Sequence, residues 1–247
     1  MVSTLAWGAA AAVVLAALAL RRYAADFYDV VIVHMTRVWY EAVLGDLQER
    51  GGAEGGSGAA VVDIGVGTAT ALVKNKQAVL DAGLRVVGID YDSSYIEKGR
   101  RVVAAAGLSQ AVTLHCCSFF DAALPARLLS ENGGRQFEAA YFSGSFTLLP
   151  DPAAALQICR QLVRPGGWVY ITQTFQRHSP PGLAVLKPLL RYLTTIDFGQ
   201  LTYEHELQAL LDTAEGLMYV PDSSPSSVHL SGGFILGVFC AEWCTMR

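Results

Sequence analysis

The feature that most constrains the fold is the run Val61-Val62-Asp63-Ile64-Gly65-Val66-Gly67-Thr68. Apolar residues around an acid predict a buried parallel strand, and two spaced glycines predict a tight turn before a helix. Glycine suits such a turn because the backbone bends sharply and a ligand can approach it closely. Asp63 would point into the crevice where doubly wound sheets bind ligands, and its charge suits a cationic amine. The run therefore predicts a nucleotide-binding turn.

A second predicted strand, Arg85-Val86-Val87-Gly88-Ile89-Asp90, also ends in an acid. Asp90 follows the turn by roughly 20 residues, the distance expected for a carboxylate that binds ribose hydroxyls. Together the two runs resemble the class I S-adenosylmethionine-dependent methyltransferases, whose first motif is D-x-G-x-G followed by an acid that closes the second strand. Residues 137–143 are similar to the fourth strand of that family, and residues 162–169 to its turn into strand five.

The resemblance implies an α/β, Rossmann-like fold with a seven-stranded, mostly parallel sheet, an antiparallel edge strand and helices on both faces. It also implies S-adenosyl-L-methionine as the cofactor. The residues then expected at the cofactor are Asp63, Gly65, Gly67, Thr68, Asp90, Tyr91, Ser118, Phe119 and Ser143. Many family members carry an acid at the position of Ser118 to accept a hydrogen bond from the adenine amino group. A serine hydroxyl can accept the same bond less strongly, and Phe119 could pack on the ring.

The N-terminal segment, residues 1–22, is expected to be a single-pass membrane anchor. Residues 2–20 are almost wholly apolar, about 19 residues without a charge, which is long enough to span a bilayer, and Arg21 and Arg22 follow them. Arginines on this flank place the rest of the chain on the cytosolic side of a membrane whose identity stays open. A cleaved signal peptide is the alternative, although the customary basic region before the apolar run is missing.

Residues 23–58 are expected to form a lid helix and a Gly-rich linker, because helical spacing of apolar residues gives way to five glycines between positions 51 and 58. In the family this region often folds over the cofactor. The predicted substrate contacts here are Tyr28, His34, Trp39 and Tyr40. The alternative is that Trp39 belongs to an ordinary apolar core and His34 is solvated.

Residues 59–247 are expected to form the methyltransferase domain, with an insertion at 175–201 that caps the substrate pocket and contributes His178. The insertion carries an apolar helical run over 183–193, which beside a membrane anchor predicts a hydrophobic or lipid-like small-molecule acceptor. The same stripe would also serve a helix that only covers core.

Composition excludes one class of substrate. The formal charge is −4, with no cluster of Lys and Arg, so a nucleic-acid partner is not expected. The five cysteines lack metal-ligand spacing and are expected to be buried thiols, with no metal site.

Local signals predict several helices. One is expected from Thr68 to Asp81, another after a Ser94 and Glu97 capping box, and a third from Asp151 with Pro152 at its first turn. A last helix is expected from Thr202 to Glu215, followed by strands at 218–220 and 234–240.

Three functions are compatible with these patterns. The favoured one is a membrane-anchored methyltransferase, in which a general base is optional and His34, His178 and Tyr141 are the candidates by position. No catalytic residue is assigned. The second is a catalytically silent methyltransferase-like binding domain. The third is an NAD(P)-dependent oxidoreductase, which would be expected to carry a third glycine where Thr70 stands.

Overall fold

The structure is a computed structural model that describes residues 33–49, 58–176, 206, 209–210, 217–220, 229–230 and 234–243. A helix over residues 33–49 comes first. The labelled helical elements that follow are α2 (Thr70–Lys74), α3 (Lys76–Asp81), α4 (Ser93–Ala105), α5 (Leu124–Glu131), the 3-10 helix η1 (Phe146–Leu148) and α6 (Pro152–Leu162). The strands are β1 (Ala60–Ile64), β2 (Arg85–Asp90), β3 (Val112–Cys116), β4 (Phe137–Ser143), β5 (Val163–Gln176), β6 (Leu217–Val220), β7 (His229–Leu230) and β8 (Phe234–Trp243).

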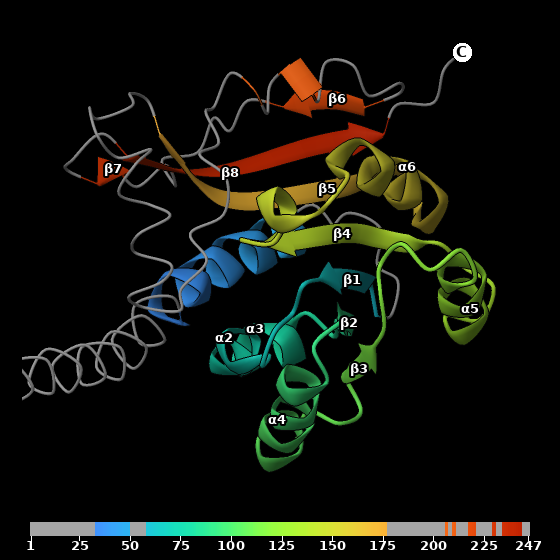
Figure 1. Ribbon diagram of the computed structural model, residues 1–247. Coiled ribbons are helices and arrows are strands. Elements are labelled where there is room, and N and C mark those ends of the chain that lie inside the picture. Colours follow the sequence, from blue (N-terminus) through green and yellow to red (C-terminus); the bar gives the residue numbers. More distant parts are fainter. Residues whose placement is uncertain are drawn as a thin grey trace, which may run out of the picture.

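These strands form one sheet in the order β3-β2-β1-β4-β5-β8-β6, with β7 paired to β8 (Figure 1). The first five are parallel to one another, which confirms the mixed α/β fold with a parallel core. In the described part of the chain the sheet has eight strands, one more than expected, because the two-residue β7 was not foreseen. β8 runs antiparallel to both β5 and β6, so the antiparallel strand lies one position inside the edge.

Helices cover both faces of the sheet (Figure 1). Buried side chains of α5 and α6 pack with one face of the strands, whereas the helix over 33–49 and α2, α3 and α4 pack with the other. Two apolar clusters therefore sandwich the sheet. The strand order reverses between β1 and β4, and ligands of doubly wound sheets bind at the carboxyl ends of the strands at such a switch point.

The predicted first helix is wrong in its extent, because it breaks into α2 and α3 at Asn75. The Asn75 side chain donates from Nδ2 to the carbonyl of Ala71, at 3.0 Å, and to that of Arg37, at 2.9 Å. Ala69, before α2, has a φ of +52°, a left-handed conformation rare outside glycine. The bond between Asn75 and Arg37 joins two distant elements, so the helix breaks although its apolar pattern is continuous.

The cap of α4 is also different from the prediction. Asp92, and not Ser94, is the N-cap residue, and its carboxylate accepts from the backbone N–H groups of Ser94 and Tyr95. The cap of α6 is confirmed, since Asp151 accepts from the N–H of Ala154. Strand five begins earlier than expected, at Val163, and the segment before Trp168 forms a bulge against β4.

Several predictions fall outside the described residues. These are the anchor at 1–22, the linker at 50–57, the greater part of the insertion at 175–201, and Tyr28 and His178. Only residues 206 and 209–210 of the expected last helix are described, and they are helical. Within the described ranges, none of the helices has the length and apolar character needed to cross a bilayer.

Candidate functional site

The turn after β1 is built around two glycines. The N–H groups of Gly65 and Val66 both donate to the carbonyl of Ile89, at 2.8 and 3.1 Å, which fastens the turn to β2. Gly65 has a φ of +77°, and a Cβ there would overlap Ser145, whose hydroxyl donates to the carbonyl of Ile64. Close packing of Ser145 therefore explains Gly65. Gly67, with a φ of +57°, faces open space instead.

Asp63 lies at the C-terminal end of β1 and is fully buried. Its Oδ2 accepts a hydrogen bond from the hydroxyl of Tyr40, which reaches across from the helix over 33–49. Its Oδ1 has no hydrogen-bond partner among the described residues. Burial raises the pKa of Asp63 to about 7, and the negative charge of Asp90 adds to that rise, whereas the Tyr40 hydrogen bond opposes it. A buried acceptor of this kind fits a cationic donor.

Asp90 ends β2 on the other side of the turn. One carboxylate oxygen accepts from the N–H of Gly67 and the other from the N–H of Asp92, each at 2.9 Å. Each oxygen keeps a further lone pair, so Asp90 can still accept from hydroxyl groups while it holds the turn. Tyr91 follows directly and is 83% exposed, so its ring lies at the surface beside the turn.

The remaining predicted cofactor residues differ in their surroundings. Ser118 is exposed, and its hydroxyl accepts from the N–H of Phe120 at 3.2 Å. Phe119 is only 5% exposed and packs edge to face on Phe142, so most of its ring belongs to the apolar core. The hydroxyls of Thr68 and Thr70 are hydrogen-bonded to each other, at 2.8 Å.

A second group of polar side chains gathers at the ends of β4 and β5. The hydroxyls of Tyr141 and Thr172 lie 3.0 Å apart. Ser143 Oγ is buried and has no hydrogen bond of ordinary geometry within the described ranges, yet it lies near enough to Tyr141 to lower the pKa of that tyrosine. Burial is the larger effect and raises the pKa of Tyr141 far above its ordinary value. Tyr141 is therefore unsuited to act as a general base, which removes one of the three candidates.

The predicted substrate residues of the lid helix separate into two environments. Trp39 and Tyr40 are buried, whereas His34 is exposed. The buried stripe of this helix consists of Trp39, Tyr40, Val43, Leu44 and Leu47. The indole Nε1 of Trp39 is buried and has no hydrogen-bond partner in the described part of the chain.

Two functional features were missed from the sequence. Ser145 shapes the glycine turn, and Thr172 fixes the hydroxyl of Tyr141. Thr172 was detectable in principle, because Tyr170 and Thr172 alternate with the apolar Val169 and Ile171 in the predicted strand. The pairing of Tyr40 with Asp63 had no local signal, since the two residues lie on different elements 23 positions apart.

The described residues include no group of three or more His, Cys, Asp or Glu side chains arranged to hold a metal ion. The cysteines that the structure describes with their side chains are Cys116, Cys117 and Cys159, and none of the three is in a disulfide. Cys159 is buried as expected, whereas Cys116 is exposed, which corrects the expectation of buried thiols.

Comparison with known proteins agrees with this geometry. Residues 61–167 match the family model described as a methyltransferase domain. A ubiquinone biosynthesis O-methyltransferase of Bordetella avium is 26% identical over 167 residues, which are 68% of this chain and 60% of that protein. The Bordetella bronchiseptica protein of the same name is 30% identical over 129 residues, 52% of this chain and 47% of its own length. The chain thus spans about half to three fifths of these relatives.

Solved structures show the same fold. An O-methyltransferase family protein from Burkholderia thailandensis superimposes with a TM-score of 0.58 over 90% of this chain and 60% of that chain, at 15% identity. A SAM-dependent methyltransferase from Aquifex aeolicus gives 0.51 over 79% of this chain and 89% of that chain, at 18% identity. At such identities the likeness concerns the fold alone. The matched residues 61–167 contain the acid and glycine turn, and this part of the chain is similar to the S-adenosylmethionine-dependent methyltransferases.

Proposed function

We propose that this protein is an S-adenosylmethionine-dependent O-methyltransferase that acts on a small, hydrophobic or lipid-like acceptor. The observation that carries the proposal is the buried Asp63 carboxylate, whose Oδ1 lacks a partner among the described residues at the carboxyl end of β1. A buried anion beside an open glycine turn needs a cationic ligand to compensate it.

The residues present fit the cofactor. Asp63 would accept from the ammonium group of its amino-acid part, and Asp90 would accept from the ribose hydroxyls with the lone pairs left by Gly67 and Asp92. Gly67 leaves open space where a side chain would otherwise stand. Tyr91, Ser118 and Ser143 border the same edge of the sheet and stay proposed contacts of the cofactor.

Methyl transfer from S-adenosylmethionine requires little general acid–base catalysis. S-adenosylmethionine bound here would supply an activated methyl group for an acceptor oxygen, with the C–S bond broken and its electron pair left on sulfur. The acceptor proton leaves to water or to a nearby base. The chain's contribution is to hold the two reactants aligned in a dry crevice. No described side chain is assigned as that base.

Oxygen is proposed as the accepting atom because the curated relatives are named O-methyltransferases. The apolar character of the acceptor and a location on the cytosolic face of a membrane are proposed from the sequence, namely the apolar residues 2–20 and 183–193.

Transfer of a tritiated methyl group from S-adenosylmethionine tests the reaction. The full chain would be assayed in detergent with a long-chain alkylphenol, the matched alkylaniline and unsubstituted phenol. The proposal expects label in the alkylphenol above all. Preference for the aniline would contradict the oxygen, and preference for phenol would contradict the hydrophobic acceptor. Tight binding of S-adenosylhomocysteine without transfer to any of the three would favour the silent binding domain.

The variant Asp90→Ala should weaken S-adenosylhomocysteine binding by roughly 5- to 150-fold, since charge-assisted hydrogen bonds are worth about 1–3 kcal/mol. Asp121→Ala is the matched control, because Asp121 is an exposed acid on the same edge that only accepts from the N–H of Ala123. Isothermal titration calorimetry of both folded variants measures their affinities for S-adenosylhomocysteine. Equal affinities in the two would remove Asp90 from the site.

A further inference from the structure

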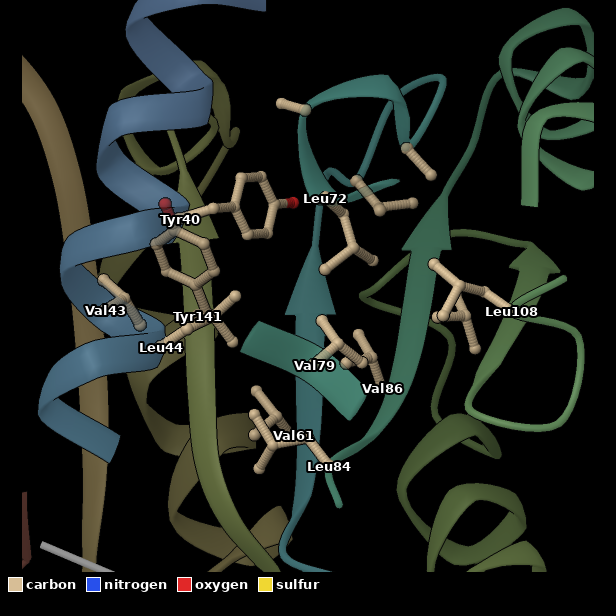
Figure 2. Close-up of a cluster of buried hydrophobic side chains, with 14 of the residues drawn as sticks. Tyr40, Val43, Leu44, Val61, Leu72, Val79, Leu84, Val86, Leu108 and Tyr141 are labelled. Carbon is tan, nitrogen blue, oxygen red and sulfur yellow. The ribbon is translucent and has the colours of Figure 1, made fainter. Parts of the chain in front are cut away.

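Tyr40 makes the one hydrogen bond found for the Asp63 side chain in the described structure. Its ring is 3% exposed and packs edge to face on Tyr141, with the ring centroids 5.0 Å apart. Figure 2 shows the two rings side by side between the blue helix and the sheet. The Tyr40 hydroxyl donates to Oδ2 and thereby leaves Oδ1 as the oxygen that can accept from a ligand.

The helix that carries Tyr40 is fixed on both sides of that residue, to the junction of α2 and α3 before it and to strand β5 after it. Before it, the carbonyl of Arg37 accepts from Asn75 Nδ2 at 2.9 Å. After it, Asp46 accepts from the hydroxyl of Tyr170 at 2.6 Å. Trp39 lies so close to Gly144 that a Cβ there would stand 3.1 Å from the indole ring. The position of the hydroxyl on Asp63 is therefore set by how the whole helix docks.

We propose that Tyr40 is a positioning residue that presents Asp63 to the ammonium group of the cofactor and so couples docking of the helix over 33–49 to cofactor binding. The inference rests on the proposed function, because it assigns Asp63 to the amino-acid part of S-adenosylmethionine. Tyr40 acts through Asp63 and does not touch the reacting atoms.

The electrostatics around Asp63 support this role. The groups that face it are Tyr40 from the helix, Asp90 from β2 and Tyr141 from β4. Burial and the charge of Asp90 favour the protonated carboxyl, and the Tyr40 bond is the one contribution among these that favours the carboxylate. An ammonium ligand needs the carboxylate. Loss of the Tyr40 hydroxyl would therefore raise the pKa of Asp63 and would also leave its carboxylate free to rotate.

The variant Tyr40→Phe removes the hydroxyl and keeps the ring that packs on Tyr141. Titration would compare S-adenosylhomocysteine with 5′-methylthioadenosine, which carries the same adenosine but no amino-acid part. We expect the variant to bind S-adenosylhomocysteine about tenfold more weakly and methylthioadenosine within about twofold of the parent chain. The pH at which S-adenosylhomocysteine affinity reaches half its maximum should also move upward in the variant.

Tyr170→Phe is the matched control. It too deletes one buried tyrosine hydroxyl that joins the sheet to the same helix, but its partner is Asp46 and not Asp63. If hydroxyl loss acts only by loosening the helix, the control should change the selectivity between the two ligands as much as Tyr40→Phe does. The proposal expects the control to change that selectivity less than Tyr40→Phe does, because the bond from Tyr40 to Asp63 is kept, and to leave the pH profile unchanged.

The titrations distinguish a failure of the proposed role of Tyr40 from a failure of the proposed methyltransferase function. A parent chain that is folded but binds neither adenosyl ligand contradicts the proposed function itself. A parent that binds S-adenosylhomocysteine, with a Tyr40→Phe variant that weakens both ligands equally or neither, contradicts only the role of Tyr40. If the variant does not fold, hydrogen exchange on the parent decides. S-adenosylhomocysteine should then protect the amides around residue 40 and methylthioadenosine should not, and equal protection by the two would overturn the coupling.

Discussion

At the scale of single residues, Asp63 should leave a signature in the pH dependence of stability. Burial raises its pKa to about 7 in the folded chain, against 3.8 for an ordinary aspartate. The folded state then holds the proton more tightly than the unfolded state, so the stability contributed by this group is greatest at low pH and falls as pH rises from about 4 to about 7.

The variant Asp63→Asn should lose that dependence because its side chain stays neutral. A tenfold difference in proton affinity is worth about 1.4 kcal/mol. The free energy of unfolding that Asp63 contributes should therefore fall by at most roughly 4 kcal/mol between about pH 4 and pH 7. Urea unfolding of the ligand-free chain and the variant across this range measures it. Parallel pH profiles for the two proteins would contradict an elevated pKa at Asp63.

Gly65 should be among the least replaceable residues of the turn. A Cβ there would overlap Ser145 and stand 2.9 Å from its hydroxyl, in addition to the strain of a φ of +77°. Gly65→Ala should therefore lower the free energy of unfolding by roughly 2–4 kcal/mol. Gly133→Ala isolates the backbone cost, about 1 kcal/mol, because its φ is +69° and no atom lies within 4 Å of a Cβ there. Similar losses in the two variants would show that Ser145 moves aside.

At the scale of elements, Asn75 joins the break between α2 and α3 to the helix over 33–49. Asn75→Ala should lower the free energy of unfolding by about 1–3 kcal/mol, because the part-buried Arg37 carbonyl and the buried Ala71 carbonyl each lose a donor. Amide exchange in the helix over 33–49 should speed up as well. Gln77→Ala is the control, since Gln77 is exposed and bonds only to Asp81 at 2.6 Å. Unchanged exchange in the Asn75 variant would show that the helix docks without this bond.

The sequence predicts features that depend on neighbouring residues and misses those that depend on contacts between residues far apart in the chain. The five parallel strands and the turn at Gly65 could be predicted because each strand leaves a local run of apolar residues, and β1 and β2 also end beside a glycine or at an acid. The break at Asn75 could not, because its cause is a carbonyl 38 positions earlier in the chain. For the same reason Tyr40 was identified only as a candidate substrate contact, whereas its hydroxyl lies on Asp63.

At the scale of the whole molecule, the sheet brings two acids from separate strands to one edge, at the point where strand order reverses. Asp63 is enclosed beneath the helix over 33–49, and Asp90 holds the glycine turn beside it. The proposed function therefore depends above all on Asp63, the buried carboxylate proposed to accept from the ammonium group of the cofactor.

The most direct test is calorimetric titration of the folded full chain with S-adenosylmethionine, S-adenosylhomocysteine and NADH in parallel. The account predicts micromolar binding of both adenosyl ligands, weak or no binding of NADH, and release of protons from Asp63 when the titration is done just below neutral pH. Binding of NADH alone, or of none of the three to folded protein, would contradict it.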